Sequence, residues 1–337
     1  MVDPQAVEQL VNRGLRNQWY PVLPSWALAG TPVGITRLSE NLVLWRDDDG
    51  KVHATEDRCP HRGARLSLGW NLGDRLACWY HGVEVDGTGT VRKVPAVDNC
   101  PLEGRQCVKS YPVQEVRGAI FAYFGDEAHP EPCKLELPEE LANPEYGAIL
   151  CFTKWNCNYR YAVDNVMSHS MAFGDKTANM QLRKTPTGLA FEKTTQRDVN
   201  FDWVEFGQSG ATWLKLSIPY RASAGPGGNF GIVGFATPVD EEHCLVFFFR
   251  TRKCSGWVRD VWQFMYRVKL EGLHWAVLEQ DRFVLENLAP EARAGEFLYQ
   301  HDTGLARVRR MLQKQAEEQL AALAAHRARQ APAKASA

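Results

Sequence analysis

The chain has 337 residues, of which 45% are hydrophobic and 11% aromatic. This length and apolar content predict two folded domains with sizeable cores and exclude disorder over most of the chain. The 39 Lys and Arg residues nearly balance the 40 Asp and Glu residues, which argues against a protein that grips nucleic acid by its net charge. No apolar run is long enough to cross a bilayer, so neither nucleic acid nor a membrane is an expected partner.

Nine cysteines are spread along the chain, an odd number at wide spacings that differs from the disulfide framework of a secreted protein. Residues 1–20 contain no apolar core of the kind found in signal peptides. We therefore expect a cytoplasmic protein whose cysteines are reduced.

Residues 1–16 carry apolar side chains at helical spacing and predict a short amphipathic helix. From 17 to 126, short apolar stretches alternate with clusters of Gly, Pro, Asp and Asn, which is typical of antiparallel β-structure. Two of these clusters, at 47–50 and 85–91, predict turns between strands. This region is expected to fold as a small antiparallel β domain.

Residues 127–147 contain four prolines and predict a linker. From 148 to 328 we expect a second domain, in which a β-sheet packs on helices. Helical spacing of apolar residues is found at 161–173, 257–270, 271–288 and 305–327. Residues 329–337 are expected to be a flexible tail, and the predicted fold class is α+β.

The strongest chemical signal is a pair of Cys-His motifs, Cys59-x-His61 and, after sixteen intervening residues, Cys78-x-x-His81. Two thiolates and two imidazoles on two loops can close one metal site, and zinc is one interpretation. Zinc motifs more often pair Cys with Cys and His with His. A Rieske [2Fe–2S] cluster takes two Cys on one iron and two His on the other, so the alternating pattern favours this cluster.

The segments CPHRGARLSLG and CWYHGVEVDGTG resemble the Rieske domain of ring-hydroxylating and related Rieske non-haem iron oxygenases, over about residues 17–126. Respiratory Rieske proteins carry an additional cysteine in each loop, where this chain has Ala64 and Tyr80. The resemblance implies a [2Fe–2S] cluster whose ligands are Cys59, His61, Cys78 and His81.

The resemblance also implies that residues 148–328 form a helix-grip domain, which holds one Fe(II) by two His and one carboxylate. In the family the two His follow an Asp/Asn-Asn-x-x-Asp motif on a helix. This motif begins well at Asp164 and Asn165, but Ser168 stands where the next Asp is expected. After His169, Gly174 stands where the family has its second His.

Asp281, on a late helix, is the best match to the iron-binding carboxylate, and Asp164 is the carboxylate nearest to the family's electron-bridging Asp. Three interpretations of the departure stay open. A segment with the Asp and both His is absent from this sequence but present in the working protein, or the gap is real and the second iron is missing. In the third, His169 with Asp175 or a remote histidine such as His274 builds an altered site with Asp281.

With both metals, the resemblance implies a terminal oxygenase α subunit that uses O2 to hydroxylate or demethylate a small aromatic compound of the phthalate, vanillate or dicamba kind. Electrons would come from NAD(P)H through a separate ferredoxin or flavin reductase, and would pass between neighbouring subunits of a homotrimer. Without the second iron, the alternative is an electron-transfer protein or a catalytically dead relative of the oxygenases. A zinc-stabilised binding domain is the third hypothesis.

Overall fold

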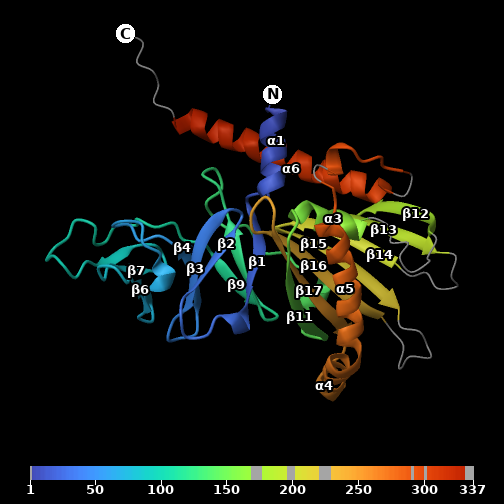
Figure 1. Ribbon diagram of the computed structural model, residues 1–337, viewed down its shortest axis with the longest axis horizontal. Helices are drawn as coiled ribbons and strands as arrows, with labels where there is room; N and C mark the ends of the chain where they lie inside the picture. The colour runs from blue at the N-terminus through green and yellow to red at the C-terminus, as the bar shows by residue number, and fades with distance from the viewer. Residues whose placement is uncertain are drawn as a thin grey trace, which may run out of the picture. The chain divides into compact units, whose positions relative to one another are not determined.

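The computed structural model describes residues 2–167, 177–195, 202–219, 229–289, 292–299 and 302–330. The chain divides into two compact units, of which the smaller is Trp19–Phe124. The larger joins Met1–Gln18 to Gly125–Ala337. Figure 1 shows that each unit is built around its own β-strands, and the mixed α+β class predicted from the sequence is confirmed.

The smaller unit consists of short antiparallel strands, as predicted. Its elements are β1 (Gln18–Pro24), β2 (Val33–Arg37), β3 (Glu40–Arg46), β4 (Val52–Glu56), β5 (Trp70–Asn71), β6 (Arg75–Ala77), β7 (Glu84–Asp86), β8 (Val91–Lys93), β9 (Val113–Val116) and β10 (Ala119–Phe124), with single 3-10 turns at Ser25–Ala27 and Leu66–Leu68. The neighbours run β2-β3-β4, β5-β6-β7-β8 and β1-β10-β9. The turns predicted at 47–50 and 85–91 connect β3 to β4 and β7 to β8.

The core of the smaller unit has two parts. Alternate residues of β10 pack with β1, β3 and β4 in one of them. The other contains Trp45 and Leu66 and also the predicted ligands Cys59 and Cys78, which are almost completely buried. The thiols of the Cys-His motifs therefore belong to the core of this unit. Burial of each large apolar side chain packed around them contributes about 1.5–3 kcal/mol to the free energy of folding.

The larger unit combines one antiparallel sheet with helices. Its elements are α1 (Pro4–Arg13), α2 (Glu139–Ala142), β11 (Tyr146–Trp155), α3 (Tyr159–Met167), β12 (Thr177–Lys184), β13 (Gly188–Thr195), β14 (Asp202–Ser209), β15 (Ala211–Pro219), β16 (Asn229–Pro238), β17 (Cys244–Lys253), α4 (Gly256–Met265), α5 (Glu271–Glu286) and α6 (Thr303–Gln330), with a 3-10 turn at Ala292–Ala294. The strands follow the order β11-β17-β16-β15-β14-β13-β12, and β11 pairs with β17 along its whole length.

One face of this sheet is covered by helices. Buried side chains of β17, such as Phe248, pack against Trp262 and Tyr266 and against residues of α3. α4 and α5, expected as separate helices, are connected without a loop by a π-helical turn at Tyr266–Leu270. α1 and α6, from opposite ends of the sequence, pack against each other (Figure 1), and Val11 and Val308 belong to the same core cluster.

Several predicted boundaries shift. The segment expected to be a linker contains α2 and the first residues of β11. α3 begins two residues before the predicted start, and the rest of the predicted helix lies outside the described residues. α6 is longer than 305–327 at both ends, and residues 331–337 of the expected tail also lie outside the described part.

Candidate metal centres

The two Cys-His motifs form two loops of the same backbone structure. In each loop, the cysteine N–H donates to the carbonyl five residues on, and the N–H of the glycine four residues on donates to the cysteine carbonyl. These bonds, 2.7–2.9 Å long, run from Cys59 to Ala64, from Gly63 to Cys59, from Cys78 to Val83 and from Gly82 to Cys78. Both glycines have φ near +70°, a conformation that favours glycine and explains its place in each motif.

The four predicted cluster ligands meet as two pairs. The thiols of Cys59 and Cys78 are buried, and the Cys59 thiol donates a hydrogen bond to Cys78. The imidazoles of His61 and His81 are exposed, with ring centroids 4.8 Å apart. Each loop thus contributes one buried sulfur and one exposed imidazole.

This donor arrangement fits a two-iron cluster better than a single ion. Among the residues that the structure describes, no three His, Cys, Asp or Glu side chains converge closely enough to hold one metal ion. A zinc site would require such convergence. A [2Fe–2S] cluster of the Rieske type would instead take two thiolates on one iron and two imidazoles on the other, which fits one pair of thiols beside one pair of imidazoles.

The protonation of the thiols points the same way. Burial raises the pKa of Cys59 to about 11, so the thiol stays protonated without a metal. A bound metal reverses this preference because a coordinating thiol loses its proton. The ligand roles of Cys59, His61, Cys78 and His81 stay a prediction, which this geometry supports.

Aromatic side chains surround the exposed imidazoles. Trp79 stacks on Trp70 with centroids 4.8 Å apart, and Tyr80 lies 3.8 Å from the His81 ring. The Arg62 guanidinium lies over Tyr80. Trp79 is 64% exposed and Tyr80 55%, so these aromatics lie outside the β core. They form an apolar rim around the histidines.

The candidate second metal site brings together one residue of α3 and one residue of α5. The side chain of Asn165, on α3, donates a hydrogen bond to Asp281, on α5. Burial raises the pKa of Asp281, and the bond from Asn165 lowers it by less. His169 and Asp175 lie outside the described residues. In the described part, the donors at this place are one carboxylate without an imidazole, which does not complete the ligand set of a mononuclear iron.

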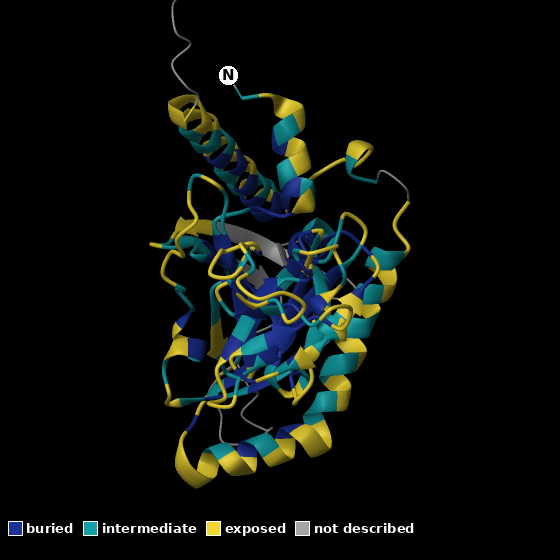
Figure 2. Ribbon diagram, turned by 90° about the vertical axis from the view of Figure 1, so that its left-hand side faces the viewer, coloured by how far each residue is buried: buried dark blue, intermediate teal, exposed yellow. Residues whose placement is uncertain are grey.

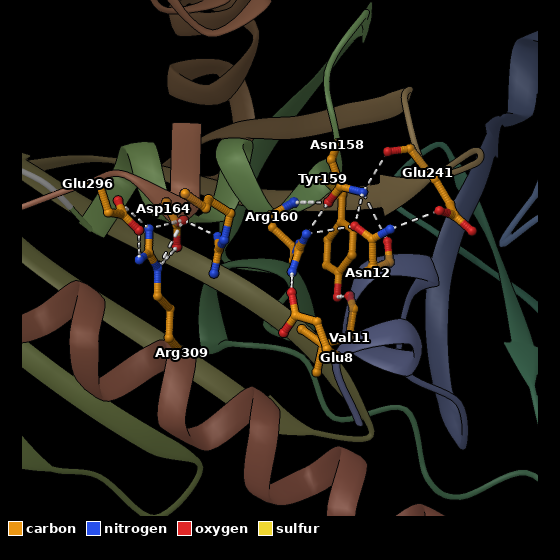
Figure 3. Close-up of polar contacts among 11 residues, drawn as sticks. Glu8, Val11, Asn12, Asn158, Tyr159, Arg160, Asp164, Glu241, Glu296 and Arg309 are labelled. Carbon is orange, nitrogen blue, oxygen red and sulfur yellow. Dashed lines mark hydrogen bonds and ion pairs between the residues drawn. The ribbon is translucent and has the colours of Figure 1, made fainter. Parts of the chain in front are cut away.

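Asp164 lies in a different environment from its neighbour on α3. It is 7% exposed and accepts hydrogen bonds from Arg293 (2.5 Å) and Arg309 (2.7 Å). Arg309 also pairs with Glu296 (Figure 3). Burial raises the pKa of Asp164, while these arginines lower it. Consecutive helical residues point about 100° apart, so Asp164 turns away from the Asn165–Asp281 contact.

His274 is not placed beside Asp281. Seven residues of α-helix separate the two by about 10.5 Å along the axis. The His274 ring instead contacts Tyr266, with Nδ1 3.3 Å from the phenol oxygen. Burial, and then the charge of Arg250, lower the pKa of His274 to about 4, so its imidazole is neutral at pH 7. The structure gives no support to His274 as a substitute ligand.

Two arginines near Asp281 in the sequence, Arg282 and Arg293, each pair with another acidic residue. Arg282 pairs with Glu279, and Arg293 with Asp164. The sequence did not reveal that Arg309 holds Asp164, because the two residues are 145 positions apart and only packing of α6 against α3 joins them.

Comparisons with known proteins agree with this division of the chain. The Rieske [2Fe-2S] domain family matches residues 18–112, and the vanillate O-demethylase oxygenase C-terminal domain family matches residues 155–318. The vanillate O-demethylase oxygenase subunit of a Pseudomonas species is 36% identical over 170 residues, which make up 48% of this chain and 47% of that protein. The chain thus spans about half the length of this curated relative.

Solved structures show the same fold over nearly the whole chain. The terminal oxygenase of carbazole 1,9a-dioxygenase from Novosphingobium sp. has a TM-score of 0.74 at 21% identity, covering 92% of this chain and 95% of its own. Dicamba monooxygenase bound to dicamba has a TM-score of 0.72 at 24% identity, covering 91% of this chain and 99% of its own. Because a Rieske domain is joined here to the C-terminal domain of vanillate O-demethylase oxygenases, the chain belongs to the Rieske oxygenase family.

Proposed function

We propose that the chain is the oxygenase component of a Rieske non-haem iron enzyme, which uses O2 and electrons from a separate reductase. The observation that carries the proposal is the pair of matched loops, which place two buried thiols under two adjacent imidazoles. The cluster supplies one-electron transfer when it is bound. The loops fix the four donors, and the buried sulfurs and the apolar rim limit the access of water to one side of the site.

The substrate in this proposal is a small substituted aromatic compound that is hydroxylated or demethylated. The support is the family of the second domain, together with the vanillate and dicamba in the names of similar proteins. Asp281 is the proposed carboxylate ligand of the second iron and His169 a proposed imidazole ligand. Asn165, through its hydrogen bond, would hold the Asp281 carboxylate in one orientation.

A homotrimer is part of the proposal, and the exposed apolar surface supports it. Trp70, Trp79 and Tyr80 surround the two histidines of the smaller unit, and α4 exposes Trp257 and Phe264. Figure 2 shows exposed residues along much of α4 and α5. Exposed patches of this kind mark protein interfaces, and a second copy of the chain is the proposed partner.

The electron donor is proposed to be a ferredoxin or a flavin reductase. A solved complex of the oxygenase and ferredoxin of carbazole 1,9a-dioxygenase shares this fold, with a TM-score of 0.69. No helix in the described part of the chain is both long and apolar enough to span a bilayer. A cytoplasmic location is proposed on the composition alone.

Metal analysis of anaerobically purified protein resupplied with Fe(II) tests the proposal. An iron-to-sulfide ratio of about 3:2 and substrate-dependent O2 uptake with a reductase are the expected results. The same measurement on an Asp281→Asn variant should give about 2:2, because the cluster ligands are untouched. A wild-type ratio of about 2:2 without O2 uptake would reject the oxygenase.

The second candidate function is electron transfer without oxygenation. The observation that favours it is the pair of ion pairs that two arginines form with Asp164. Asp164 is the carboxylate nearest to the position of the family's electron-bridging Asp. The two functions differ in the fate of electrons. A reduced electron-transfer protein would hand its electron to an external acceptor and would leave O2 uptake unaffected by any aromatic compound.

A further inference from the structure

Two thiols outside the metal centres lie in contact inside the larger unit. Cys157 follows β11, and Cys244 is the first residue of β17, opposite Trp155 in the strand register. Both side chains are in the core formed by the sheet and the helices, and the Cys244 thiol donates a hydrogen bond to the Cys157 sulfur. The chain thus holds a preformed pair of sulfur atoms in a place with no assigned role.

The backbone on both sides of Cys157 is anchored. The N–H of Asn156 donates to Glu286 at the end of α5, at 2.8 Å. The side-chain amide of Asn158 donates to the carbonyls of Asn12 (3.0 Å) and Glu241 (2.8 Å), as Figure 3 shows. Because both neighbours are fixed, Cys157 has little freedom to move away from Cys244.

The two thiols are not equivalent. Cys157 is 7% exposed, whereas Cys244 is completely buried, so a small solute reaches Cys157 first. The hydrogen bond from Cys244 lowers the pKa of Cys157 in spite of its burial, and raises that of Cys244. Thiolate character and access decide which cysteine reacts with an oxidant, so Cys157 is the nucleophile of the pair.

We propose that Cys157 and Cys244 are a redox-active dithiol, which hydrogen peroxide converts into an intramolecular disulfide. The Cys157 sulfur attacks one peroxide oxygen, the O–O bond breaks, and hydroxide leaves and takes up the thiol proton as water. The Cys244 sulfur then attacks the sulfenic acid on Cys157, the S–S bond forms, the S–O bond breaks, and a second water leaves with the Cys244 proton. Two thiols lose two electrons in total, and one peroxide is reduced to two waters.

The position of the pair gives the reaction a structural consequence. Cys157 lies two residues before α3, the helix that carries Asn165 and Asp164. A disulfide would join the start of α3 covalently to the start of β17. Oxidation would therefore restrict the motion of the start of α3, the helix that contacts Asp281. This effect does not depend on whether a second iron binds at Asp281.

Peptide mapping of the cluster-loaded full chain tests the proposal without any assay of activity. The protein is treated with a small excess of hydrogen peroxide, blocked with N-ethylmaleimide in denaturant and digested with trypsin. Cleavage after Lys and Arg places Cys157 alone in residues 155–160 and Cys244 alone in residues 222–250. The expected product is these two peptides joined, with a mass two hydrogens below their sum, and its loss on reduction.

Matched variants separate the pair from general oxidation. Cys244→Ser should abolish the joined peptides and leave a sulfenic acid on Cys157 that dimedone captures. Cys254→Ser should leave the joined peptides unchanged, because Cys254 is equally buried and donates to the Arg252 carbonyl at 3.4 Å instead of to a thiol. The Cys59 and Cys78 peptides report any loss of the cluster.

The proposal is overturned if wild-type Cys157 carries N-ethylmaleimide in full after peroxide treatment, or if Cys157 joins a cysteine other than Cys244. It is also overturned if Cys254 is oxidised as fast as Cys157, because the contact with Cys244 would then give no advantage. The peptide map of the peroxide-treated wild-type protein decides the proposal by itself, so a Ser variant that fails to fold would not prevent a result.

Discussion

Asn165 on α3 donates a hydrogen bond to Asp281 on α5, and this contact opposes the effect of burial on the Asp281 carboxylate. A half-buried acid with a raised pKa is destabilised in its charged form unless a cation or a donor accompanies it. One amide compensates only in part. The arrangement is typical of functional sites, where a group is kept at a cost in stability for a ligand that it binds.

Asp281→Asn should therefore stabilise the metal-free protein at pH 7 by about 1 kcal/mol. In the metal-loaded protein, the same change should abolish binding of the second iron, which lies outside the [2Fe–2S] cluster. The folded-state pKa of Asp281 lies above its ordinary value of 3.8, so the cost of its charge is present at neutral pH. This cost decreases as the pH falls through the raised folded-state pKa and is absent below the ordinary value. Urea unfolding at pH 7 and pH 3.5 measures both effects. An equal gain of stability from Asp281→Asn at the two pH values, or a loss at pH 7, would contradict this account.

Asp164 is expected to be structural in the described network. Asp164→Asn leaves Arg293 and Arg309 without their carboxylate and should cost about 2–3 kcal/mol, less than a fully buried pair because both arginines keep some contact with water. Glu8→Gln is the matched control, since Glu8 pairs with Arg160 but is largely exposed, and should cost less than about 1 kcal/mol. Urea denaturation measures the free energy of unfolding of both variants. Equal losses of stability would show that the ion pairs of Asp164 are no stronger than the exposed pair of Glu8.

The sequence predicted the parts of the molecule in which chemistry is local. Cys59 with His61, and Cys78 with His81, are each held by one short loop, so their spacing is enough to infer the site. The antiparallel strands of the smaller unit and the helices from 257 onward follow from periodicity in the same way.

Long-range packing decided what the sequence did not reveal. The position of Asp164 between Arg293 and Arg309 depends on how α6 and the segment before it pack on α3. The π-helical turn between α4 and α5 also has no signature in the apolar pattern, because it shifts the register of a helix without ending it. The thiol contact of Cys157 with Cys244 requires the pairing of β11 with β17, which no motif indicates.

His274 should make the stability of the protein depend on pH. Its pKa is lowered from 6.5 to about 4, so the unfolded chain takes up a proton that the folded chain refuses. Stability from this residue is complete above pH 6.5 and is lost as the pH falls towards 4, by about 1–2 kcal/mol because solvent screens the partly exposed ring. His274→Gln should flatten this part of the curve in urea unfolding between pH 7 and pH 4.5.

The glycine of each cluster loop should be needed for its backbone conformation. Gly63 has φ +75°, and a Cβ there would meet nothing closer than the Arg58 side chain at 3.7 Å, so Gly63→Ala adds strain without a clash. The expected loss of stability is about 1 kcal/mol, with a smaller yield of the cluster absorbance. Gly30→Ala is the control, because Gly30 has open space and no positive φ. A Gly63→Ala protein with wild-type stability would show that the loop conformation is not constrained.

Trp79 tests whether the apolar rim around the histidines is covered by another copy of the chain. A Trp that is 64% exposed in the isolated chain contributes little to folding, so Trp79→Ser should leave the urea midpoint nearly unchanged. If a second subunit buries this side chain, the same change should weaken assembly about tenfold or more, since buried Trp residues dominate interface energies. Sedimentation velocity over a dilution series measures the effect. Trp26→Ser, at a tryptophan 72% exposed and outside the rim, is the matched control. Equal assembly of the Trp79→Ser protein and the wild type would place the contact between copies elsewhere on the surface.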